Sequence, residues 1–118
     1  MRAVVLVAHG SRVAASNDEV RQLAQALQQK VAERYQRVEA AFLELAQPSI
    51  EEAIAAAIAA GAASVLVLPY FLAAGKHVTR DVPEIVSRCR LAHPAVDIEL
   101  ADYLGKHPGL LELLAQAL

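Results

Sequence analysis

Two histidines follow apolar runs of the kind that form buried strands. His9 comes directly after the run 3–8, and His77 comes shortly after the run 64–70. Open α/β sheets bind their ligands outside the carboxyl ends of the parallel strands. Imidazole is a common ligand of zinc and of first-row transition metals, so this placement predicts a metal site or a pair of bases. The alternatives are a loop cap for His9 and a solvated loop position for His77.

A carboxylate, Glu44, stands near the end of a third apolar run, which we expect to form a strand over residues 38–45. A charge in such a stretch needs a partner, because an unpaired buried carboxylate is costly. Glu44 is therefore a candidate metal ligand or proton acceptor beside the histidines. The alternative is an ion pair at the end of the strand, with Arg12 or Lys76 as its partner.

Strands alternate with amphipathic helices, and this order predicts a single α/β domain over residues 1–118 with a parallel sheet covered on both faces. Two Ser-x-x-Glu segments, 16–19 and 49–52, have the spacing of helix capping boxes, and Gly61 is a typical helix terminator. The expected strands cover 3–8, 38–45, 64–70 and 96–101, and the expected helices cover 16–37, 49–60, 78–92 or 81–92, and 110–118.

A flavodoxin-like strand order, 2-1-3-4, places the topological switch point between the first and third strands. These are the strands that precede His9 and His77, and the second strand carries Glu44. The fold therefore predicts that two imidazoles and a carboxylate meet in one crevice although they lie far apart in the sequence.

Basic and backbone groups are expected around this crevice. Gly10 and Ser11 would offer backbone N–H groups at a helix entrance, which is a weak anion site. Arg12, Lys76 and Arg80 add positive charge near the same rim. Their alternative role is ordinary solvated surface charge.

The segment Tyr70, Phe71 and Leu72 could form an apolar wall for a flat ligand, or it could pack beneath its own loop.

The motifs of nucleotide-binding proteins and of serine hydrolases are absent from the sequence. The chain has no Gly-x-Gly-x-x-Gly, no Gly-Lys-Ser/Thr and no Gly-x-Ser-x-Gly segment, so phosphate-binding loops and a serine nucleophile elbow are not supported.

Composition indicates a cytoplasmic globular protein without nucleic-acid or membrane partners. The chain is 56% hydrophobic with a net charge of −2, and its charges are scattered, so no basic face for nucleic acid is expected. No apolar run approaches the ~18 residues that span a bilayer. The single cysteine, Cys89, fits a reducing compartment.

Several segments together resemble the class II tetrapyrrole chelatases, above all the small sirohydrochlorin chelatases of the CbiX and SirB type. The most specific is a P-x-F-L-x-x-G-x-H-x-x-x-D-x-P pattern, and the resemblance extends over nearly the whole chain. The matching segments are Val7-Ala8-His9-Gly10-Ser11, Phe42-Leu43-Glu44 with Pro48-Ser49-Ile50, and Pro69-Tyr70-Phe71-Leu72 with Gly75-Lys76-His77 and Asp81-Val82-Pro83.

The resemblance implies a lyase that inserts cobalt or iron, or alternatively nickel, into sirohydrochlorin during cobalamin or siroheme biosynthesis. It implies that His9 and His77 handle the metal, that Glu44 is an acidic partner, and that no cofactor is needed beyond the substrate metal. Because longer relatives join two such units, it also implies a homodimer. The rival interpretations are a non-catalytic metal carrier with the same ligands and a structural module whose histidines are incidental.

Overall fold

A computed structural model describes residues 1–118, in which four strands form one parallel sheet. The strands are β1 (Arg2–Ala8), β2 (Arg37–Phe42), β3 (Ser64–Pro69) and β4 (Asp97–Leu100), and their spatial order is β2-β1-β3-β4. Every neighbouring pair is parallel, with Ala3 opposite both Arg37 and Val65. The predicted fold class and strand order are thus confirmed.

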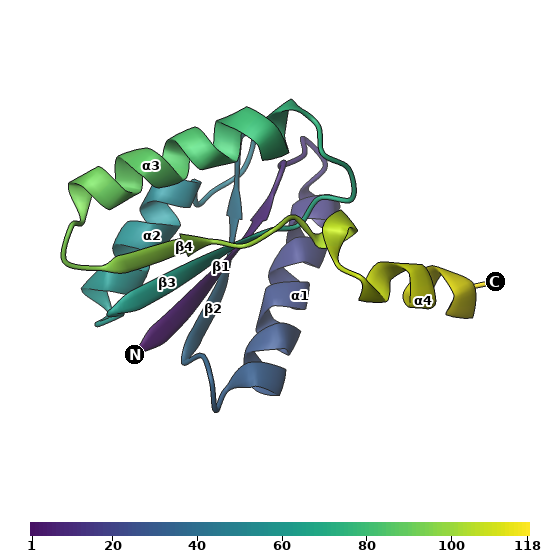
Figure 1. Cartoon of the computed structure of the whole chain (residues 1–118), viewed down its shortest axis with the longest axis horizontal. Helices are drawn as coiled ribbons and strands as arrows, with labels where there is room; N and C mark the ends of the chain where they lie inside the picture. The colour runs from purple at the N-terminus through teal and green to yellow at the C-terminus, as the bar shows by residue number, and fades with distance from the viewer.

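Helices cover both faces of the sheet (Figure 1). The covering helices are α1 (Ala14–Val31), α2 (Ile50–Ala59) and α3 (Val82–Ala92), whereas α4 (Gly109–Gln116) lies away from the sheet (Figure 1). Helix α1 packs on one face over a small apolar cluster that includes Leu6 and Phe42, whereas α2 and α3 pack on the other face over a larger cluster that includes Val5 and Ile54. Burial on both faces explains why β1 is a continuous apolar run rather than an alternating one.

Helix α2 has the ends that its sequence predicted. The Ser49 hydroxyl accepts from the Glu52 backbone N–H at 3.1 Å, and the Glu52 carboxylate accepts from the Ser49 N–H at 2.9 Å. Just beyond the helix, Gly61 adopts a φ of 108°, which side chains other than glycine rarely tolerate. Local chemistry therefore delimits this helix at both ends.

Helix α1 differs from its prediction at both ends. It begins at Ala14, with Val13 at the cap and no side-chain cap hydrogen bond, so the expected capping box at 16–19 does not form. It ends at Val31 rather than at residue 37, because Arg37 pairs with β1 opposite Ala3. Tertiary pairing thus converts the end of a helical pattern into the start of a strand.

Strand β2 stops at Phe42, earlier than the predicted residue 45. Leu43 and Glu44 still donate backbone hydrogen bonds to Ala8 and His9, but Leu45 turns the chain with a φ of 65°. This turn leaves Glu44 beside the end of β1.

The segment after β3 enters its helix through a wide turn. Residues His77–Asp81 form a π-helical turn, which α3 continues directly. In a regular helix the Pro83 ring would clash with the carbonyl four residues earlier, and a wider turn relieves such a clash. β4 and α4 each differ by one or two residues from the predicted ranges.

Helix α4 projects away from the rest of the molecule (Figure 1). Three of its large apolar side chains are exposed, Leu111, Leu113 and Leu114, and so is Leu118 just beyond its end. None of the helices combines the length and apolar character that crossing a bilayer requires.

Candidate functional site

His9 and His77 lie side by side although 67 residues separate them in the chain. Their ring centroids are 4.7 Å apart, with the ring planes tilted by 50°. His9 follows β1 and His77 opens the π-helical turn after β3, so the strand order brings them to the switch point as predicted. Both side chains are partly exposed, at 43% and 44%, which leaves the imidazoles accessible from solvent.

Glu44 contacts His9 rather than either of the cations suggested from the sequence. Its Oε1 lies 3.1 Å from Nε2 of His9, and its backbone N–H donates to the His9 carbonyl at 3.1 Å. Gly10 makes this approach possible, because a Cβ at that position would lie 1.7 Å from the Glu44 carbonyl oxygen. No ion pair of the structure involves Arg12 or Lys76.

Both ring nitrogens of His9 face oxygen acceptors. Nδ1 lies 3.0 Å from the Gly10 carbonyl, and Nε2 lies against Glu44. A metal that binds Nε2 of His9 must therefore take the place of the Glu44 contact.

The three predicted ligands, His9, His77 and Glu44, are not arranged around a common metal position in this structure. No group of three or more His, Cys, Asp or Glu side chains is arranged to hold a metal ion. The physical reason is that His9 and Glu44, two of the three predicted ligands, hydrogen-bond to each other.

Asp81 contacts His77, a contact that the sequence motifs did not indicate. Its Oδ2 lies 2.8 Å from Nδ1 of His77, while Arg80 Nε lies 3.3 Å from Oδ1 of the same carboxylate. The hydrogen bond to His77 is the main reason that the pKa of Asp81 lies below its ordinary value. The four-residue spacing from His77 to Asp81 on a helical turn was the available signal.

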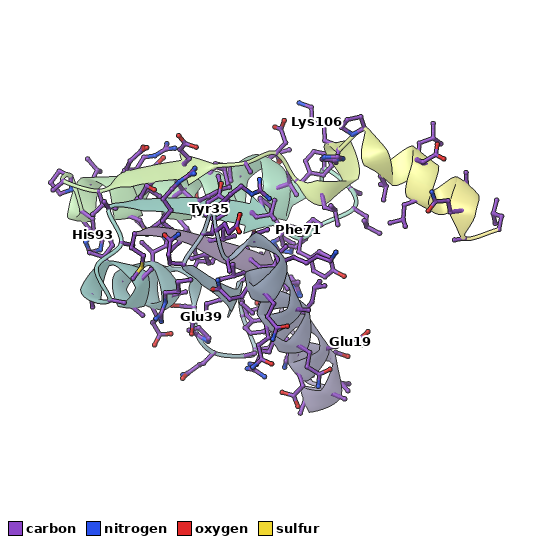
Figure 2. All side chains as sticks on the ribbon, turned by 90° about the horizontal axis from the view of Figure 1, so that it is seen from below. Glu19, Tyr35, Glu39, Phe71, His93 and Lys106 are labelled. Atoms are coloured by element: carbon purple, nitrogen blue, oxygen red, sulfur yellow. The ribbon has the colours of Figure 1, made fainter.

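The expected wall of Tyr70, Phe71 and Leu72 is divided in the structure. Phe71 packs against the core and stacks on His77, with centroids 6.3 Å apart and planes at 26°. Figure 2 shows Phe71 at the end of the sheet from which the chain leads to α4. Tyr70 instead lines a hollow beside α1, and Leu72 is exposed. Of the three side chains, only that of Phe71 therefore faces both His77 and the core.

The Ser11 backbone N–H, which was expected to offer part of an anion site, already donates to a protein oxygen. The Ser11 N–H donates to Asn17 Oδ1 at 2.9 Å, and the Asn17 amide donates to the Ser11 carbonyl at 2.8 Å. Asn17 is the buried polar residue of α1, and it closes the loop that follows His9. In the sequence, Asn17 stands inside a Ser-x-x-Glu segment whose capping box does not form.

A hollow of about 280 Å³ opens beside His77 towards α3. Its lining has more acidic than basic side chains, which favours the approach of a cation. The lining residues are Leu43, Glu44, His77, Asp81, Glu84, Ile85 and Arg88.

Fold and site together define an α/β protein with paired imidazoles at the switch point of a parallel sheet, each held by a carboxylate. The family model described as CbiX matches residues 3–118, and the chain belongs to that family. This confirms the family that the sequence motifs indicated.

Individual relatives agree with this assignment. The chain is 42% identical over 86 residues to a sirohydrochlorin cobaltochelatase of Methanococcus maripaludis, covering 73% of this chain and 58% of the relative. It is 32% identical over 111 residues to the chloroplastic sirohydrochlorin ferrochelatase of Arabidopsis thaliana, covering 94% and 48%. The crystal structure of a CbiX protein from Marinobacter aquaeolei VT8 superposes with a TM-score of 0.80 at 32% identity, covering 99% and 93%. The chain thus spans about half of the length of these two curated relatives.

Proposed function

We propose that this chain inserts a divalent metal ion, cobalt or iron, into sirohydrochlorin. The observation that carries the proposal is the 4.7 Å approach of the His9 and His77 rings at the carboxyl edge of the sheet. The activities named for the two curated relatives support the substrate and both metals. Nickel also suits this donor set, because imidazole is a ligand for nickel as well as for iron. The product would then serve cobalamin or siroheme biosynthesis.

Metal insertion requires that two pyrrole N–H protons leave as the ring nitrogens replace water on the metal. Two neutral imidazoles can hold a metal and leave its other positions open for the macrocycle. In this site, a metal that takes Nε2 of His9 would displace the proton that this nitrogen donates to Glu44, 3.1 Å away, and this proton would leave to solvent and free the carboxylate. The freed carboxylate then lies where it can accept one of the two pyrrole protons, and the other would leave to solvent, to which the site is open.

The macrocycle carries carboxylates around its rim, and cations near the site can bind them. Arg12, Lys76 and Arg80 are exposed or partly exposed there and serve this role in the proposal. Phe71 contributes by holding His77 from one side, with Tyr70, Leu72 and Ser11 as further candidate contacts.

We also propose that the protein acts in the cytoplasm as a homodimer. The exposed leucines of α4 support pairing, because contiguous exposed apolar patches mark interaction sites. Sedimentation at micromolar concentration measures this directly.

The function is tested by substituting each histidine and following sirohydrochlorin metallation by its absorbance. His9→Ala and His77→Ala are expected to lose most of the initial rate above the uncatalysed background while still melting cooperatively. His93→Ala is the matched control, since His93 ends α3 at the opposite end of the sheet from Phe71 (Figure 2). Near-normal turnover by either variant at saturating metal would show that the substituted histidine does not take part in metal insertion. If the wild-type protein binds metal but does not metallate sirohydrochlorin, the protein is a non-catalytic metal carrier instead.

A further inference from the structure

Asp81 and His77 form a hydrogen-bonded pair on one side of the π-helical turn. The Nδ1–Oδ2 distance is 2.8 Å, which lies in the range of strong charge-assisted hydrogen bonds. The carboxylate is itself held, since Arg80 Nε lies 3.3 Å from its other oxygen. The His77 imidazole is therefore hydrogen-bonded to a carboxylate whose orientation is itself fixed by Arg80.

This contact sets which nitrogen of His77 carries the proton. A carboxylate only accepts, so Nδ1 must donate, and in the neutral ring Nε2 then keeps its lone pair. Nε2 makes no hydrogen bond in the structure, whereas Nε2 of His9 lies against Glu44. The two imidazoles are thus not equivalent, and His77 offers the unoccupied donor atom.

We propose that Asp81 is a positioning residue that holds His77 in the Nδ1–H tautomer, with Nε2 ready to take the incoming metal. This inference rests on the proposed function for its consequence in metal insertion, but the tautomer itself is a property of the metal-free protein. Carboxylates that accept from the second nitrogen of a metal-binding histidine orient the ring and raise its basicity as a ligand. Phe71 completes the alignment by stacking on the same ring.

The first experiment reads the tautomer in the metal-free protein by nitrogen-15 NMR of labelled histidine rings. The wild-type protein should show His77 with the proton on Nδ1. Asp81→Ala should show a mixture of tautomers or the Nε2–H form, and Asp81→Asn keeps the shape of the side chain in case the alanine variant folds poorly. Asp97→Ala is the matched control, because Asp97 is an exposed aspartate at the start of β4. An unchanged Nδ1–H signal in both Asp81 variants would overturn the proposal.

The second experiment separates the metal from the tetrapyrrole in steady-state kinetics. Substitution of such a carboxylate typically costs ~10–100-fold in metal affinity or activity. Asp81→Ala should therefore raise the KM for cobalt by about this factor and leave the KM for sirohydrochlorin near its wild-type value. A wild-type KM for cobalt in Asp81→Ala, with Asp97→Ala also unchanged, would refute the positioning role.

The two experiments distinguish the inference from the function on which it rests. If the wild-type protein fails to metallate sirohydrochlorin, the proposed function is wrong, and the NMR result still decides whether Asp81 sets the tautomer. If the wild-type protein metallates sirohydrochlorin normally while the tautomer does not depend on Asp81, only the positioning role is wrong.

Discussion

Gly10 is the position where a single added methyl group should do most damage to the site. Its φ of 97° is strained for any residue with a side chain. A Cβ there would also lie 1.7 Å from the Glu44 carbonyl oxygen and 2.9 Å from its carbonyl carbon. Gly10→Ala must therefore both strain the backbone and push the Glu44 segment away from His9.

The expected loss can be worked out from these two effects. A residue held in a sparsely populated backbone region costs about 1–3 kcal/mol. Real Cβ contacts are essentially never under 3.0 Å, so the 1.7 Å contact requires a shift of about 1.3 Å, the difference between the two. Overpacking of this kind adds about 1–3 kcal/mol. We expect a destabilisation of about 2–6 kcal/mol, or roughly 8–24 °C in Tm at about 4 °C per kcal/mol.

Thermal and urea unfolding, followed by circular dichroism, measure this loss. Gly75→Ala is the matched control, because a Cβ at Gly75 meets nothing within 4 Å and its φ is not positive. That variant should stay within about 0.5 kcal/mol of the wild type. The reasoning is refuted if Gly10→Ala is as stable as Gly75→Ala, or if its structure keeps Glu44 in place against His9.

Three further predictions concern stability and reactivity away from the site. Ser49→Ala should destabilise the protein by about 1 kcal/mol through loss of the α2 cap, and urea unfolding would show it. Hydrogen bonds from Ser49 lower the pKa of Glu52, so its contribution is present above its ordinary pKa of 4.5 and is lost as the pH falls through the lowered value. The stability advantage of the wild type over Glu52→Gln should therefore shrink in acid, and a constant difference from pH 7 to pH 3 would contradict this. Burial raises the pKa of the Cys89 thiol. Cys89 should therefore react slowly with a thiol reagent at pH 8 in the native protein and rapidly in urea. Equal rates in the two conditions would count against its burial.

Local signals predicted an element well where both of its ends carried their own chemistry. Helix α2 has a hydroxyl and a carboxylate that satisfy each other's backbone donors at one end and a glycine at the other, and its range was confirmed. Helix α1 carried a similar signal at residues 16–19 that the fold does not use. Asn17, which belongs to that signal, is buried and binds the Ser11 backbone instead. A contact that closes a loop in three dimensions outweighed a local cap worth about 1 kcal/mol.

The meeting of His9, His77 and Glu44 was predictable from the sequence, since alternating apolar strands and amphipathic helices imply a parallel sheet. In the flavodoxin-like order that was expected, such a sheet brings the carboxyl ends of those strands together. The pairing of each histidine with its carboxylate was decided only by the tertiary structure. Glu44 binds His9 because the chain turns at Leu45 and passes against the bare backbone of Gly10, and Asp81 binds His77 because a wide turn precedes α3. Hydrogen bonds depend on ångström-scale positions and on angles, whereas periodicity specifies only which face or edge of an element a residue occupies.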